Sequence, residues 1–83
     1  MNFDRETSLQ DELRTLEKAD RDIDAGNRLI REQAKLMEQI ERDGQDPLLA
    51  LQLLMTLKAS LQAMVEHRTL ILERIEHLRR ERG

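Results

Sequence analysis

The sequence predicts an all-α protein, an antiparallel two-helix hairpin that pairs with another hairpin into a four-helix bundle. Charged residues make up 37% and aromatic residues 1% of the 83 residues, a composition typical of long helices and coiled coils. Apolar residues recur in steps of three and four on both sides of the middle of the chain, as in packed helices. A turn signal at residues 43–47 separates the two stretches.

Three residues predict the turn. Gly44 can adopt the positive φ that closes a helix. Asp46 can accept hydrogen bonds from the free N–H groups of the next helix as its N-cap. Pro47, the one proline, suits the first helical position. We therefore expect one domain over residues 1–83, with a helix at about 6–43, a turn at 44–46 and a helix at about 47–81.

The first helix is predicted from two series with a spacing of seven residues. The series at heptad position d is fully apolar, and the series at position a is half polar. The d residues are Leu9, Leu16, Ile23, Ile30 and Met37, and the a residues are Leu13, Asp20, Asn27, Ala34 and Glu41. The heptad phase does not change across Gly26, so we expect a continuous or slightly bent helix rather than a break. Close approach of the second helix is expected there, opposite Val65.

The second helix shows the same pattern more strongly. Its a residues are Leu54, Leu61, Arg68 and Ile75, and its d residues are Leu57, Met64, Ile71 and Leu78. In an antiparallel pair, an a layer faces a d layer. Leu13 then faces Leu78 and Met37 faces Leu54, which places the midpoint inside the turn. Periodicity and turn chemistry therefore predict the same fold.

Three polar residues interrupt this seam, namely Asp20, Asn27 and Arg68. Arg68 falls opposite Ile23 and one turn from Asp20. An interhelical ion pair that fixes the register is the favoured interpretation, because single polar seam positions are a known register device. The alternative is a polar pocket.

The chain has more apolar surface than a two-helix seam can bury, and most of the excess lies near the turn. Such flanking residues call for further helices around the core. We predict an interface made of Leu29, Leu36, Ile40, Leu48, Leu49, Leu51, Leu53, Val65 and Leu72. The simplest partner is a second copy in a symmetric dimer, and the alternative partner is another helical protein.

The sequence favours a non-enzymatic interaction module, since no nucleophile–base set, Gly-rich phosphate loop, cofactor motif or full set of metal ligands is evident. The segment at 20–24 lacks the Gly and Glu of a calcium loop at the required positions. Glu73 and His77 form an i,i+4 pair without further ligands. The alternative function is phosphotransfer through His67, because Glu66-His67-Arg68-Thr69-Leu70 resembles the phospho-accepting box of histidine kinases.

Charge and hydropathy limit the classes of partner and the cellular compartment that we expect for this protein. Residues 1–46 contain 8 basic and 13 acidic residues, a net charge of −5, and residues 47–83 contain 6 and 4, a net charge of +2. This distribution lacks the basic face of a nucleic-acid binder. The N-terminus lacks the pattern of a secretory signal, and the apolar run Leu48–Leu57 is shorter than the ~20 residues of a membrane span. We expect a cytoplasmic protein without nucleic-acid, membrane or small-molecule ligands.

Several short stretches resemble a set of short bacterial helical-hairpin proteins. These stretches are Leu29-Ile30-Arg31, Gly44-Gln45-Asp46, Leu61 to Met64 and Glu66-His67-Arg68. The resemblance begins at about residue 13 and rests on the Gly-x-Asp turn and on the His-Arg pair in the second helix. It implies a hairpin fold and implies no activity.

Overall fold

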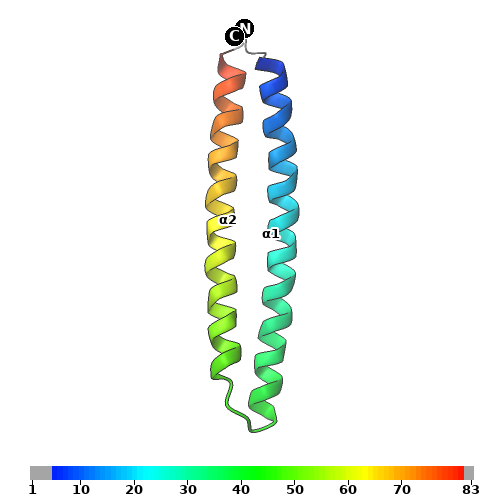
Figure 1. Ribbon diagram of the computed structural model, residues 1–83, viewed down its shortest axis with the longest axis vertical. Helices are drawn as coiled ribbons and strands as arrows, with labels where there is room; N and C mark the ends of the chain where they lie inside the picture. Colours follow the sequence, from blue (N-terminus) through cyan, green and yellow to red (C-terminus); the bar gives the residue numbers. More distant parts are fainter. Residues whose placement is uncertain (1–4, 82–83) are drawn as a thin grey trace.

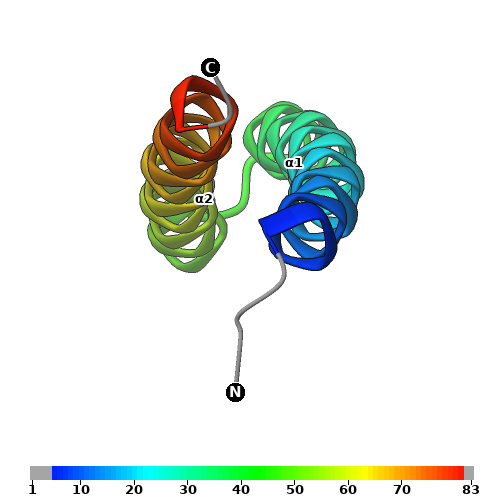
Figure 2. The same cartoon turned by 90° about the horizontal axis from the view of Figure 1, so that it is seen from above.

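The computed structural model describes residues 5–81, which form two helices, α1 (Arg5–Arg42) and α2 (Leu48–Arg80). The helices lie side by side and antiparallel, with the beginning of α1 and the end of α2 at the end opposite the turn (Figures 1 and 2). The molecule is a rod of 64 × 21 × 14 Å. The predicted all-α hairpin is confirmed, and each helix end lies within one residue of its predicted position.

Gly44 ends α1 in the conformation predicted for it, with φ of 76°. Its N–H donates to the Glu41 carbonyl at 3.0 Å, and the N–H of Gln45 donates to the Ile40 carbonyl at 3.1 Å. These two bonds form a Schellman motif, which satisfies carbonyls that a helix end otherwise leaves free. The chain then reverses direction over residues 43–47.

The start of α2 differs from the prediction by one residue. Pro47, expected to be the first helical residue, has φ of −85° and ψ of 9° and lies just before the helix. Its carbonyl accepts the N–H of Leu51 at 2.8 Å. The Asp46 carboxylate accepts the N–H of Leu48 at 3.0 Å, so Asp46 still satisfies one free donor of the first turn, although it is not the residue directly before the helix.

Burial along α2 follows the predicted heptad. Every α2 residue that is not exposed occupies position a or d, and Ala50 extends the d series toward the turn. These residues are Ala50, Leu54, Leu57, Leu61, Met64, Arg68, Ile71, Ile75 and Leu78. Ile71 is 0% exposed and lies at the centre of the packing.

The buried stripe on α1 is wider than predicted, because the g positions also face α2. These residues are Glu12, Ala19, Gly26, Gln33 and Ile40, of which Ala19 is buried and the others are half-buried. The Gln33 side chain donates to the Ala50 carbonyl at 3.0 Å. Sequence periodicity missed this third column because small and polar residues contribute little apolar signal.

The main core lies in the half of the hairpin away from the turn. We call residues 5–23 and 66–80 the end half, and residues 24–42 and 48–65 the turn half. Ala19, Ile71 and Ile75 form the core cluster of the end half, with Leu9, Leu13 and Leu16 packed against it. Ala50 and Leu54 are the buried residues of the turn half.

Gly26 lies at a close approach of the helices, but its predicted neighbour is wrong. A Cβ atom at Gly26 would lie 3.3 Å from Leu61 Cδ1 and 4.0 Å from Met64 Sδ. Val65 is instead 46% exposed, because it occupies position e, on the other side of the seam from the g column of α1. The helix is continuous through Gly26.

Candidate interaction surface

The described residues expose ten large apolar side chains and bury five apolar residues. Their exposed fractions run from 38% for Leu72 to 79% for Leu49. Eight of the nine predicted interface residues are in this exposed group, and the ninth, Ile40, is half-buried. Met55 and Leu70 belong to the group as well, in addition to the nine residues named for the interface.

Helix geometry divides the exposed apolar residues between two sides of the hairpin. In an antiparallel pair, the g positions of the two helices lie on one side of the seam, and the e positions lie on the other. The ion pair between Glu12 and Arg74, with Glu12 Oε1 and Arg74 Nε 3.2 Å apart, joins two g positions and marks the first side. Positions c flank this side, and positions b flank the other.

Both helices contribute to the first side, which we call the two-helix face. Its apolar residues in the turn half are Leu29, Leu36, Ile40, Leu49 and Leu53. Uncharged residues continue the face between and beyond them, namely Gly26, Gln33, Thr56, Ser60 and Ala63. The g and c positions from residue 26 to 40 and from 49 to 63 therefore carry no charge.

Only α2 contributes apolar residues to the second side, which we call the α2 edge. The α2 edge consists of Leu48, Leu51, Met55, Val65 and Leu72. Lys58 interrupts it and makes no hydrogen bond or ion pair with the residues that the structure describes. The adjacent e and b positions of α1 are exposed and mostly charged: Asp24, Arg28, Arg31, Lys35, Glu38 and Arg42.

The two sides therefore differ in what they can bind. A partner that packs on the two-helix face meets two uncharged helix surfaces in the turn half. A two-helix partner on the α2 edge would have to cover the charged surface of α1 as well, and burying charges without partners is costly. The two-helix face is the side suited to a four-helix bundle.

Two ion pairs link the helices in the end half. Arg68 Nε lies 2.5 Å from Asp20 Oδ1, and the two side chains are 37% and 49% exposed. Of the polar residues predicted for the seam, Asp20 and Arg68 therefore come together. Asn27 does not join them, because it lies one heptad nearer the turn, where it is half-buried. Partly exposed pairs of this kind contribute up to about 1 kcal/mol.

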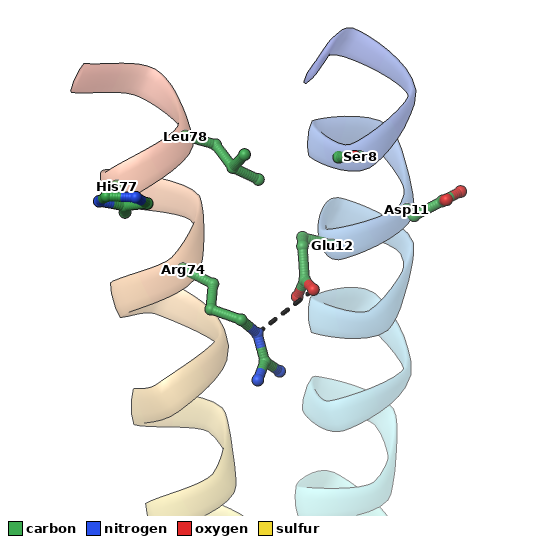
Figure 3. A pocket seen from close by; sticks show the side chains of 6 residues that line it. All are labelled: Ser8, Asp11, Glu12, Arg74, His77 and Leu78. Atoms are coloured by element: carbon green, nitrogen blue, oxygen red, sulfur yellow. Dashed lines mark ion pairs between the residues drawn. The ribbon is translucent and has the colours of Figure 1, made fainter. Parts of the chain in front are cut away.

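A shallow hollow lies near the chain ends, lined by Ser8, Asp11, Glu12, Arg74, His77 and Leu78 (Figure 3). Glu12 reaches across to Arg74, and its Oε2 atom is buried without a hydrogen bond. Asp11 points away from the hollow and pairs with Arg14. His77 Nε2 lies 3.0 Å from Glu81 Oε1. The hollow therefore holds one interhelical ion pair and no nucleophile next to a base.

His67, the residue of the predicted phosphotransfer alternative, lies on the surface of α2. His67 is exposed at a g position of the end half, and no hydrogen bond or ion pair joins it to another described residue. Within residues 5–81, no group of three acidic, His or Cys side chains could hold a metal ion. Glu73 is exposed on the outer surface of α2, and His77 forms its ion pair with Glu81.

Among the described helices, α2 is long and apolar enough to cross a membrane by length and composition alone. The sequence-based prediction considered only the run Leu48–Leu57 and underestimated the length of the apolar segment. The interrupting Gln52 and Thr56 are uncharged, and Lys58 is the one charged residue between Leu48 and Val65. In that segment only Ala50 and Leu54 are buried. The α1 helix, which carries 8 basic and 10 acidic residues, lies against α2 along its length.

Comparison with known proteins identifies no relative of this chain. The chain matches no family model, and no curated protein and no solved structure matches it significantly.

Proposed function

We propose that this protein is a non-enzymatic helical interaction module that associates with a second copy of itself through its exposed leucines. The observation that carries the proposal is the exposure of ten large apolar side chains among the described residues. Monomeric proteins rarely leave contiguous apolar surfaces of this kind in water, and helices with several apolar faces pack into bundles.

The free energies of leucine burial and of association are consistent with reversible dimerisation. Completing the burial of a half-exposed leucine contributes about 1 kcal/mol. The five apolar residues of the two-helix face would contribute about 10 kcal/mol in a symmetric dimer. Association itself costs about 4–15 kcal/mol. The difference leaves at most about 6 kcal/mol for association, a Kd of about 40 µM, so we expect a dimer that forms at tens of micromolar and dissociates on dilution.

A membrane location would conflict with the hairpin. A bilayer excludes charged side chains at a cost of about 2.5–3.5 kcal/mol each, so α2 could span it only after separating from the charged α1. Association with helices in water covers the same leucines and keeps the hairpin intact. The expected cytoplasmic location follows from this proposal.

Sedimentation equilibrium of the wild-type chain from about 1 to 500 µM tests the proposal. We expect a monomer–dimer equilibrium. The double variant Leu51→Asp/Leu53→Asp, which places a charge on both apolar sides, should remain monomeric. Gln52→Asp is the matched control, because it adds the same charge at an exposed position between them. A wild-type chain that stays monomeric throughout would overturn the proposal.

A further inference from the structure

Self-association through the exposed leucines leaves open the orientation of the second copy relative to the first. Three arrangements would bring two copies of the two-helix face together. The copies could overlap fully with their turns at the same end, overlap fully with their turns at opposite ends, or overlap only through their turn halves. The distribution of charge and of leucines along the rod distinguishes them.

We propose that two copies pack through the two-helix face in full overlap, with their turns at the same end. A two-fold axis parallel to the rod then sets α1 of each copy against α2 of the other. Every neighbouring pair of helices in the resulting four-helix bundle is antiparallel. This inference rests on the proposed function and specifies its partner, its surface and its orientation.

The turn half excludes full overlap with turns at opposite ends. Such a dimer would place the uncharged turn half of one copy on the end half of the other. The same side of the end half carries Glu12, Asp22 and Arg74. Leu29 and Leu36 would then cover charged groups instead of leucines. Removing charged groups from water without new partners opposes binding.

The end half favours full overlap over a dimer made of turn halves alone. On its two-helix side, α1 carries the acidic residues Glu12 and Asp22, and α2 carries the cation Arg74. With turns at the same end, the acidic helix of each copy faces the more basic helix of the other. Such complementary charges favour the correct orientation during association.

Leu70 supports the same arrangement. It occupies a c position of the end half, on the side of the two-helix face, and is 53% exposed. The pair between Asp20 and Arg68 places Leu70 close to the level of Ala19 along the rod. In full overlap Leu70 would lie over Ala19 of the second copy, between Thr15 and Asp22 of that copy. A dimer of turn halves would leave Leu70 in water.

Two substitutions two residues apart identify the face. Leu53 belongs to the two-helix face and Leu51 to the α2 edge, and both are exposed. We expect Leu53→Asp to weaken dimerisation at least about 100-fold, because a symmetric dimer would bury two unpaired carboxylates. Leu51→Asp, the matched control, should dimerise as the wild type does. The opposite result would overturn the choice of face.

A second variant tests the same face if Leu53→Asp does not fold. If circular dichroism shows that Leu53→Asp loses helix, Leu36→Asp places the same charge on the α1 part of the two-helix face, where Leu36 is 50% exposed. This variant should also be a folded monomer. A folded Leu36→Asp dimer of wild-type affinity would contradict the proposed face.

Distances between spin labels determine the orientation. The chain has no cysteine, so Gln45→Cys in the turn and Gln10→Cys in the end half each carry one label per copy. With turns at the same end, both variants should give distances below about 30 Å, because neighbouring helix axes lie about 8–10 Å apart. Opposite turns in full overlap would give a Gln45→Cys distance near the 64 Å length of the rod and a Gln10→Cys distance of about 45 Å, because Gln10 lies inside α1 rather than at its end.

The remaining outcomes separate the two proposals. A dimer of turn halves would give a Gln45→Cys distance of about half the rod length and a longer Gln10→Cys distance. Either long-distance result would leave self-association intact and overturn the arrangement. A wild-type chain that is monomeric at every concentration would overturn the proposed function and the arrangement together.

Discussion

In the seam, the ion pair between Asp20 and Arg68 joins the two helices across 48 residues of sequence. The sequence predicts an ion pair here because an acidic and a basic residue occupy seam positions one turn apart. The predicted partner of Gly26 was wrong because residues were matched by their level along the seam alone, whereas Gly26 occupies position g and Val65 position e, on opposite sides. Periodicity therefore predicts which residues face the other helix, and packing determines which of them touch.

The pair between Asp20 and Arg68 should contribute measurably to stability. We expect a double-mutant cycle of Asp20→Ala and Arg68→Ala, read by urea unfolding, to give a coupling of about 0.5–1 kcal/mol, because both side chains are partly exposed. Lys18→Ala is the comparison. It removes the exposed pair with Asp22, at 2.7 Å within one helix, and should cost no more than about 0.5 kcal/mol. A cycle with zero coupling would show that the pair does not fix the register.

At the scale of the helices, the turn and the α2 stripe were predictable, because both depend on local chemistry. A positive-φ glycine and a strict heptad leave few alternatives. The width of the α1 stripe was not predictable in the same way. Its g column contains Ala19, Gly26 and Gln33, which face α2 only because small residues let the helices approach. The division of the leucines into two faces also required knowing which g positions lie together.

Gly44 should be the most sensitive position of the turn. We expect Gly44→Ala to lower the free energy of unfolding by about 1 kcal/mol, because an L residue is strained at φ of 76°. No atom lies within 4 Å of an added Cβ atom, so the whole effect would be conformational. Gly44→Asn should recover part of the loss, since Asn tolerates this conformation. Equal stability of the Ala and Gly chains in urea would contradict this account of the turn.

The whole molecule is a rod with its core cluster in one half and eight of the ten exposed large apolar residues of the described chain in the other. The intramolecular core in the end half stabilises the hairpin. We expect a partner to cover the exposed leucines of the turn half. The sequence predicts that most of the excess apolar residues lie near the turn. It does not predict that the intramolecular core cluster lies in the other half, because both halves of α2 show the same heptad.

Stability should therefore depend on protein concentration. For a chain that folds and dimerises, the thermal midpoint rises with concentration by mass action. We expect such a rise for the wild type by circular dichroism between about 5 and 500 µM. The rise should disappear for Leu36→Asp, which retains the end-half core. A wild-type midpoint that is independent of concentration would indicate that the hairpin is stable alone.

The short turn also determines the order in which the molecule can assemble. Gln33 and Ala50 are 17 residues apart in sequence, whereas Asp20 and Arg68 are 48 apart. Loop closure makes the first contact cheaper by about 1 kcal/mol. We expect the hairpin to close from the turn toward its ends, so that the leucines of the turn half are presented while the end-half core is still open. Folding and encounter with a second copy would then overlap in time.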